Sequence, residues 1–225
     1  ISKSYNSELN GYYALEKIYN TESNTDFLAT YANTFKDLSL SASVGGNIQY
    51  AYSSDIQSWS QSKAGIIAPE FFNLSNIAPV NLRSSGGYSQ KAIYSLYATT
   101  SLGYKDMAYL DLTGRNDWSS TLPSDNFSYF YPSASLSLLL NRIFHMNNDI
   151  SLLKIRGGWA SVGKDTDPYN LYGTVGIGSY GGIVTEFTSS VQKNQELKPE
   201  QAVSTEFGVD VNLFKNRLRF EGTIY

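Results

Sequence analysis

The chain has 225 residues and a formal net charge of −3 at neutral pH, with 18 tyrosines, 18 glycines, one histidine and no cysteine. The lack of cysteine excludes a disulfide scaffold, a cysteine-based zinc site and a thiol nucleophile, and the single His145 leaves little room for histidine-based metal or triad chemistry. The nearly balanced charge offers no basic patch for nucleic acid, and no apolar run approaches the ~18–20 residues of a transmembrane helix.

The first quarter of the chain predicts three strands. Residues 9–19 and 27–35 alternate weakly between apolar and polar side chains, and a polar loop at 20–26 separates them. After a turn at Lys36-Asp37, residues 38–52 show the clearest alternation of the chain. This run of 15 residues is much longer than the roughly 5–6 residues usual for soluble strands.

The stretch from Tyr94 to Trp118 predicts a β-hairpin about a turn at 104–106. One face of the hairpin carries the apolar residues Leu96, Leu110 and Leu112. The other face carries the polar residues Asp111, Thr113 and Arg115. Long strands with one apolar face and one strongly polar face are typical of a sheet that lies between lipid and a water-filled lumen.

Long excursions separate the remaining strands. The first covers 53–88. It contains the sequence Ser-Ser-Gly-Gly at 84–87, which is expected to interrupt regular structure, and its middle is long enough for a short helix. Loops of this length are uncommon and usually functional. The turn at 141–149 is compact and accommodates one helical turn. The other excursions cover 117–127 and 163–202, and the other predicted strands cover 129–140, 150–162, 203–213 and 218–224.

The connections alternate between short and long from the second strand onward. The short ones are Lys36-Asp37, 104–106, 141–149 and 214–217, and the long ones are 53–88, 117–127 and 163–202. In an up-and-down meander every second connection lies at the same rim, so all the long loops share one rim, as in an outer-membrane barrel. We therefore predict an all-β fold: an antiparallel up-and-down meander that is part of a transmembrane β-barrel wall in the lipid bilayer, with long extracellular loops.

A soluble β-sandwich that binds glycans through loop aromatics is the main alternative, because its strands alternate as well. Charged residues recur in mid-strand on the polar face, and aromatic residues collect near strand ends, as the interfacial girdles of barrels require. The mid-strand charges are Asp111, Arg115, Lys154, Arg156, Glu206, Asp210, Arg219 and Glu221. These features favour the membrane interpretation.

Four motifs occur in a characteristic order: YLDLTGRNDW at 109–118, YFYPSAS at 129–135, LKIRGGWASVG at 153–163 and LKPEQAVSTEFGVD at 197–210. With these motifs the chain resembles the barrel of SusC/RagA-type TonB-dependent transporters of the Bacteroidetes outer membrane. The resemblance covers residues 90–225 through the motifs and the first 89 residues through the strand pattern alone.

The resemblance implies a full barrel of about 22 strands with an N-terminal plug. It implies import of a bulky nutrient, a glycan or a peptide, driven through the TonB complex, with a SusD-like surface lipoprotein as a cap, and it implies no cofactor. The chain starts at Ile1 without a signal peptide and stops at Tyr225 in a strand pattern. We therefore expect it to be part of a longer protein that supplies the plug, the TonB box and the remaining strands, and we do not expect this part alone to transport.

Two sets of charged residues are the candidates for chemistry. Asp111, Arg115 and Asp117 could serve as acid and base in glycoside hydrolysis, but an ion pair between Asp111 and Arg115 in the barrel wall is the simpler interpretation. The second set is Lys154, Arg156, Glu206 and Asp210. For these residues we favour cross-strand pairing over a role in setting lumen polarity. No nucleophile, metal set or acid–base pair stands out, so an enzyme is the least favoured class.

The remaining candidates lie near the predicted outer rim. The residues that could contact substrate or a partner are Trp59, Arg115, Asn116, Asp117, Trp118 and Tyr180. Asp165-Thr166-Asp167 has oxygen ligands that could suit calcium, but the full ligand pattern is missing, so a loop turn is favoured. The glycines between Gly176 and Gly182 follow no strand-to-helix turn, which argues against a phosphate loop.

Overall fold

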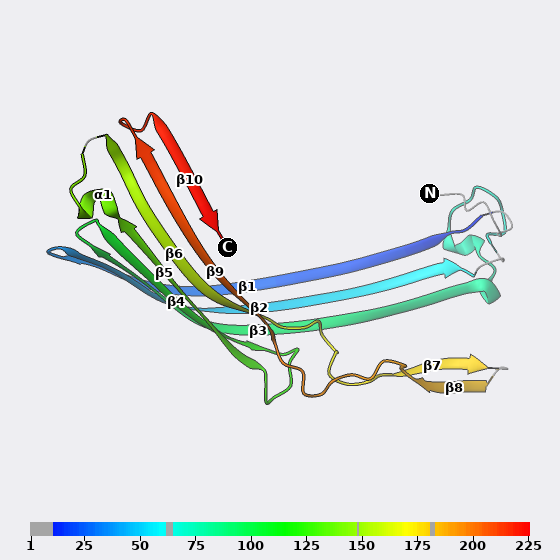
Figure 1. The fold of residues 1–225 in the computed structure, drawn as a ribbon. Coiled ribbons are helices and arrows are strands. Elements are labelled where there is room, and N and C mark those ends of the chain that lie inside the picture. Colours follow the sequence, from blue (N-terminus) through cyan, green and yellow to red (C-terminus); the bar gives the residue numbers. More distant parts are fainter. Residues whose placement is uncertain (1–10, 62–64, 148, 181–182) are drawn as a thin grey trace. The chain divides into compact units, whose positions relative to one another are not determined.

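The computed structural model describes residues 11–61, 65–147, 149–180 and 183–225. Eight strands form one sheet in the order β1-β2-β3-β4-β5-β6-β9-β10, and β7 and β8 form a second sheet (Figure 1). The strands of the large sheet are β1 (Ala14–Phe35), β2 (Leu38–Ser60), β3 (Leu82–Tyr104), β4 (Ala108–Ser119), β5 (Ser128–Leu139), β6 (Ile150–Lys164), β9 (Glu200–Leu213) and β10 (Leu218–Ile224). The small sheet consists of β7 (Val175–Tyr180) and β8 (Ile183–Thr188).

In the described ranges, helical structure is confined to three short elements. They are the 3-10 turns η1 (Leu74–Asn76) and η2 (Pro79–Asn81) and the helix α1 (Leu140–Ile143). None of the helices in the described ranges has the length and apolar character needed to cross a membrane. The predicted all-β antiparallel meander is confirmed. Strands β1 and β10 are the two edges of the large sheet, so the sheet is open in the described part of the chain.

The chain divides into two compact units. Unit 1 comprises the described residues of Ile1–Ser23 and Tyr50–Lys91, and unit 2 comprises Asn24–Gln49 and Ala92–Tyr225. Unit 1 therefore contains one end of each of the strands β1, β2 and β3 and the connection between the last two.

A small core stabilises the connection in unit 1. Ile66 and Ile77 are almost fully buried. Asn76 is also buried, and its side-chain amide donates to the carbonyl oxygens of Ala68 and Phe71 at 2.8 and 2.6 Å, while its Oδ1 accepts from the Ala68 amide at 2.9 Å. One side chain thus satisfies three backbone groups and ties the start of the connection to the turn η1.

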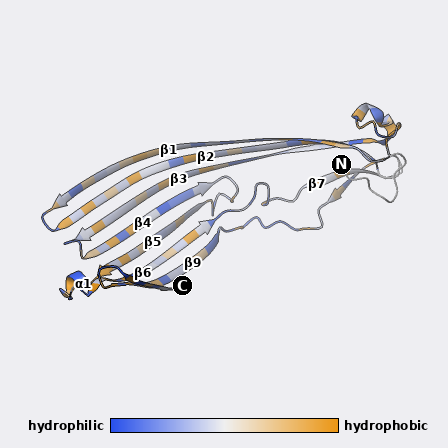
Figure 2. Ribbon diagram, turned by 90° about the horizontal axis from the view of Figure 1, so that it is seen from above, coloured by the Kyte–Doolittle hydropathy of each residue, from blue (hydrophilic) through white to orange (hydrophobic). Residues whose placement is uncertain are grey.

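The sheet of unit 2 has two chemically different faces. Apolar side chains recur at every second position of β3 to β6, β9 and β10, and the hydropathy colouring alternates along the strands in Figure 2. We call the resulting surfaces the apolar face and the polar face. The apolar face includes Leu96, Leu112, Phe130, Leu136, Phe207, Val209 and Phe220, which are between 41% and 66% exposed. Leu122 is the buried hydrophobic residue of unit 2 in the described ranges, so the sheet covers little of its own apolar surface.

The connections alternate between short and long, as predicted. The short ones span 36–37, 105–107, 140–149 and 214–217, and the long ones span 61–81, 120–127 and 165–199. We call the strand ends joined by the short connections the turn end and the opposite strand ends the loop end. The helical turn expected within 141–149 is confirmed as α1.

The prediction of separate strands at 9–19 and 27–35 is wrong, because β1 continues through 20–26 and the large sheet has eight strands rather than nine. Polar side chains of this segment have partners on β2. The Ser53 hydroxyl donates to Asn20 Oδ1 at 2.7 Å, and Asn47 Nδ2 donates to Asp26 Oδ1 at 2.8 Å. Because cross-strand partners satisfy these groups, the polar sequence does not end the strand.

The bounds predicted for the first excursion are also wrong. Strand β2 continues to Ser60 and β3 starts at Leu82, so the connection spans 61–81 rather than 53–88. The predicted breaker at 84–87 lies within β3. A Cβ atom on Gly86 would lie only 2.8 Å from the Asp55 carbonyl oxygen, so glycine permits a close approach of the backbones here. The short helix expected in the excursion is confirmed as η1 and η2.

Candidate functional site

The polar face carries the candidate functional residues of unit 2. Cross-strand register aligns its members on six strands. They include Ser95, Tyr97 and Ser101 on β3, Asp111, Arg115 and Asp117 on β4, Tyr131 and Ser135 on β5, Lys154 and Arg156 on β6, Glu206 and Asp210 on β9, and Glu221 and Thr223 on β10. Two hydrogen-bonded clusters of charged residues are distinguishable within this set.

The first cluster is centred on Asp117, which is only 6% exposed. Arg115 Nε donates to its Oδ1 at 2.7 Å, and the Tyr131 hydroxyl donates to its Oδ2. A second guanidinium nitrogen of Arg115 donates to the Ser95 hydroxyl at 2.8 Å. The carboxylate is therefore paired and hydrogen-bonded, which is how a buried charge is stabilised.

Aromatic rings flank Arg115 on both neighbouring strands. Tyr97 on β3 and Tyr131 on β5 are the direct cross-strand partners of Arg115. The Tyr97 ring centroid lies 5.7 Å from the guanidinium carbon, within the range of a cation–π contact. Tyr131 also stacks on Tyr129, with ring centroids 5.8 Å apart. The sequence reasoning did not connect Tyr97 or Tyr131 with Arg115, and the β3–β4 and β4–β5 registers are the signals that pair them.

The predicted ion pair between Asp111 and Arg115 is wrong. Asp111 instead accepts hydrogen bonds from Ser101 and Ser135 on the two adjacent strands. The reason is geometric, since residues four apart on one strand are separated by about 13 Å. Asp117 is only two positions from Arg115 on the same face, and the guanidinium reaches it.

Just beyond the first cluster, two buried hydroxyls contact Asp165. Ser119 and Thr121 both donate to Asp165 Oδ2, the latter at 3.1 Å. These contacts connect the β4–β5 loop with the connection that follows β6. An open hollow of about 340 Å³ next to them is lined by side chains of both signs, including Lys164, Asp167 and others. Among the described residues no group of three or more acidic or histidine side chains is arranged to hold a metal ion.

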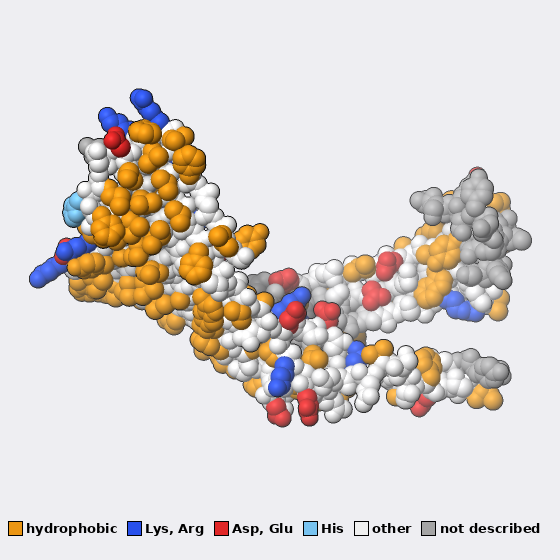
Figure 3. Space-filling view, viewed as in Figure 1, with side chains coloured by type: hydrophobic (Ala, Val, Ile, Leu, Met, Phe, Trp, Pro, Cys, Tyr) orange, Lys and Arg blue, Asp and Glu red, His pale blue; other side chains and the backbone are white. Residues whose placement is uncertain are grey.

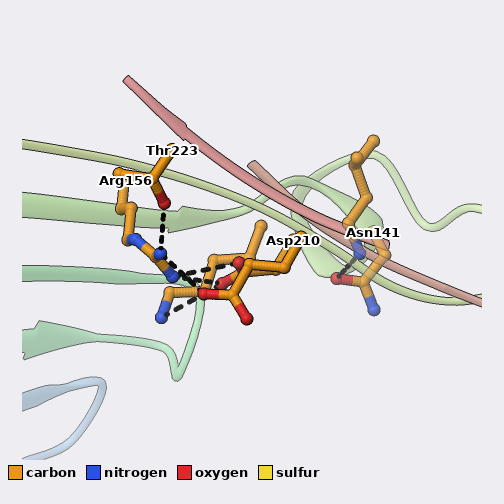
Figure 4. Close-up of polar contacts among 7 residues, drawn as sticks. Asn141, Arg156, Asp210 and Thr223 are labelled. Carbon is orange, nitrogen blue, oxygen red and sulfur yellow. Dashed lines mark hydrogen bonds and ion pairs between the residues drawn. The ribbon is translucent and has the colours of Figure 1, made fainter. Parts of the chain in front are cut away.

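The second cluster is centred on Arg156 (Figure 4). Its guanidinium donates to both carboxylate oxygens of Asp210, at 3.0 and 2.9 Å. The other terminal nitrogen donates to Glu221 and to the Thr223 hydroxyl, each at 2.9 Å. Arg156 thus connects three strands, β6, β9 and β10. Lys154 adds a longer ion pair with Asp210 at 3.8 Å, so the cross-strand pairing of Lys154 and Arg156 with Asp210 agrees with the sequence prediction.

A glycine makes room for Arg156. Gly208 lies opposite it in the β6–β9 register, and a Cβ atom there would be 2.5 Å from Arg156 Nε. Glu206, the remaining predicted member of this set, lies beside Gly158 and is exposed. The sequence reasoning placed Glu221 among the charges of the polar face but paired neither Glu221 nor Thr223 with Arg156. Their position opposite Asp210 and Gly208 in the β9–β10 register is the signal that finds them.

The other predicted contact residues do not join these clusters. Trp59 was expected in an outer loop but lies within β2, and Trp118 lies within β4. Asn116 and Trp118 occupy the apolar face, because they alternate with Arg115 and Asp117 along the strand. Asn116 donates to the Ser128 hydroxyl at 3.0 Å. Tyr180 ends β7 in the longest connection, and its side chain lies outside the described part.

Comparison with known proteins gave matches over nearly the whole chain. The family model described as "TonB dependent receptor-like, beta-barrel" matches residues 2–225. "TonB-dependent receptor P39" from Formosa agariphila is 26% identical over 225 residues, which is 95% of this chain and 20% of that protein. "TonB-dependent receptor P3" from the same organism is 26% identical over 157 residues, or 65% of this chain and 15% of that protein.

Solved structures match the fold. The structure described as the RagAB peptide transporter has a TM-score of 0.82 and 20% sequence identity, and the match covers 93% of this chain and 24% of that one. The RagAB peptide importer in its "open-open" state gives a TM-score of 0.70 at 21% identity, with 94% and 23% of the two chains covered. The chain therefore spans about a fifth of the length of the first curated relative and about a quarter of these structures.

Proposed function

Because the chain belongs to the TonB-dependent receptor-like β-barrel family, we propose that it is part of an outer-membrane barrel wall that imports a bulky polar nutrient. We assign residues 1–225 to the barrel domain. Further strands beside β1 and β10 would close the barrel, and a plug would fill it.

The exposed apolar face is the observation that carries this proposal. Large hydrophobic side chains such as Leu96, Phe130 and Phe207 are more than half exposed on one side of an eight-stranded sheet. Figure 3 shows such side chains gathered over the strands of unit 2. Contiguous apolar surface of this extent requires a cover, and the acyl chains of a bilayer supply one to a barrel wall.

The polar face then lines the lumen. Arg115 and Arg156 on this face are held by carboxylates, and serines and threonines take many of the other positions. Such a wall offers hydroxyl groups and internally balanced charges to a passing solute. This chemistry suits a hydrophilic cargo, either a glycan or a peptide. The similar RagAB structures are of a peptide transporter, which supports including peptides among the candidates.

A soluble glycan-binding sandwich receives no support from a specific observation. A sandwich needs a second sheet about 10 Å from the first to bury the apolar face. In the described ranges the other sheet consists of β7 and β8, six residues each, which is too small to cover eight strands.

Two partners follow from the proposal. A SusD-like surface lipoprotein would cap the loop end of unit 2, where the connections at 120–127 and 165–199 lie. The TonB complex would supply energy through parts of the longer protein that precede the barrel. Both assignments derive from the family resemblance, and the long, aromatic-rich connections at the loop end are compatible with the first.

Uptake by whole cells tests the proposed function. Cells that carry the full-length gene and cells that lack it would be given fluorescent oligosaccharides and fluorescent peptides, with and without a protonophore. We expect one cargo class to accumulate only in cells that carry the gene, and the protonophore to abolish accumulation. Equal accumulation in both strains for both cargo classes would contradict the proposal.

A further inference from the structure

The turn end repeats one sequence feature at each of its four connections, within the connection or where the preceding strand ends. An aromatic residue is followed directly by a basic one or by histidine, as Phe35-Lys36, Tyr104-Lys105, Phe144-His145 and Phe214-Lys215. The four aromatic side chains are between 51% and 65% exposed. More than half of each side chain is therefore open to the surroundings, and aromatic rings at such positions are typical of the boundary between the acyl chains and the headgroups of a membrane.

The basic side chains at the turn end project into solvent, and Figure 3 shows Lys and Arg side chains beyond the apolar surface. Lys105 lies 3.6 Å from Asp37 and 5.4 Å from the Tyr104 ring centroid. A hydrogen bond with Tyr104 and the charge of Asp37 raise the pKa of Lys105, so this residue is cationic at neutral pH. Arg142 donates to a neutral acceptor, the Asp106 carbonyl oxygen, at 2.8 Å.

Three further cations at the turn end have no acidic partner. Within the part of the chain that the structure describes, Lys36, Lys215 and Arg217 form no ion pair. The backbone of Lys36 and Lys215 is left-handed, with φ of 56° and 58°, which places these residues at the tips of tight turns. Their ammonium groups are therefore available to an external anion.

The two strand ends of unit 2 carry charge of opposite sign. The turn-end connections at 36–37, 105–107, 140–149 and 214–217 contain five Lys or Arg residues and three Asp residues, a net charge of +2. The loop-end connections at 120–127 and 165–199 contain two Lys residues against five Asp or Glu residues, a net charge of −3. Anions are therefore attracted to the turn end and repelled from the loop end.

We propose that the turn end binds the headgroups of anionic phospholipids in the membrane leaflet that surrounds it. The aromatic rings of the four turns lie at the level where acyl chains meet headgroups, and the adjacent cations contact the phosphates. This inference rests on the proposed function, because it requires the apolar face to be in a bilayer. It adds a specific lipid class as a partner and assigns it to one end of the strands.

The test compares two double variants of the full-length receptor that lose the same charge. K215Q/R217Q removes two cations from the turn end, and K164Q/K198Q removes two exposed cations from the loop end. Each protein is reconstituted into vesicles of phosphatidylcholine with a trace of spin-labelled phosphatidylglycerol or spin-labelled phosphatidylcholine. The fraction of each labelled lipid that the protein immobilises gives the relative affinity for the anionic lipid.

The wild type and K164Q/K198Q are expected to prefer phosphatidylglycerol equally. K215Q/R217Q is expected to lose at least about fivefold of that preference, since one cation near an anionic lipid surface contributes about that factor. An unchanged preference in K215Q/R217Q, or an equal loss in both variants, overturns the lipid inference and leaves the proposed function intact. Failure of all three proteins to insert into vesicles overturns both.

Discussion

Replacement of Asp117 by alanine is expected to loosen the pairing of β4 with β5. The carboxylate is 6% exposed and accepts from Arg115 at 2.7 Å and from the Tyr131 hydroxyl. A hydrogen bond to a charged group contributes about 1.5–3 kcal/mol. The Arg115 side chain is 36% exposed, so solvent screens this contact and the low end of the range applies. With the low end for both contacts, Asp117→Ala costs about 3 kcal/mol locally.

Hydrogen–deuterium exchange of the full-length receptor in detergent micelles measures this local cost. Because 1.4 kcal/mol corresponds to about tenfold in an opening equilibrium, the protection of amides in β4 and β5 should fall by about 100-fold in Asp117→Ala. Asp117→Asn keeps one acceptor oxygen, and its effect should be about half of that in free energy. Asp125→Ala is the matched control, because Asp125 is exposed in the adjacent loop and accepts a hydrogen bond from the neighbouring Ser124 hydroxyl at 3.2 Å.

The reasoning would be refuted if Asp117→Ala changed protection by less than about threefold, or by no more than Asp125→Ala. A double-mutant cycle with Arg115→Met separates the pair from general disruption. If the two residues stabilise the sheet through each other, the double variant should lose less protection than the sum of the single losses. Additive losses would show that Asp117 acts through Tyr131 alone.

Three further changes give contrasting results. Gly208→Ala should destabilise the β6–β9 pairing by about 1–3 kcal/mol, because its Cβ would overlap Arg156; Gly222→Ala, which meets no atom within 4 Å, should be nearly neutral in the same exchange measurement, and equal effects would contradict the packing argument. Glu221→Gln should cost less than about 1 kcal/mol, because that carboxylate is 69% exposed, and a larger loss of exchange protection in β10 would be unexpected. Asn76→Ala should make the 61–81 connection sensitive to added protease, since three backbone groups lose their partner, and unchanged cleavage would argue against this anchor.

The sequence predicts the two faces of the sheet well, because a strand alternates its side chains with a period of two. Leu112 and Thr113 lie on the predicted faces, and so do Phe207 and Glu206. The alternation of short and long connections can also be predicted from the sequence, since it depends only on the spacing between the alternating runs. These two patterns are sufficient to predict the meander.

Partners across strands are less accessible to sequence reasoning. The link from Arg115 to Tyr131 depends on the β4–β5 register. A polar side chain such as that of Asn20 predicts a loop from sequence alone, because its hydrogen-bond partner Ser53 lies on another strand. The β7–β8 hairpin was missed because glycine replaces the large side chain at alternate positions of β7. The ring of Phe187 fills the space over Gly176, which a single run does not reveal.

The central claim is that the apolar face contacts lipid and the polar face lines an aqueous lumen. Single-cysteine labelling of adjacent positions tests it most directly, and this chain contains no native cysteine to interfere. A fluorophore would be placed at Leu112, Thr113, Glu206 or Phe207 of the full-length receptor in vesicles. We expect brominated lipid to quench the labels at Leu112 and Phe207 and aqueous iodide to quench those at Thr113 and Glu206. Quenching by iodide to the same extent at all four positions would contradict the account.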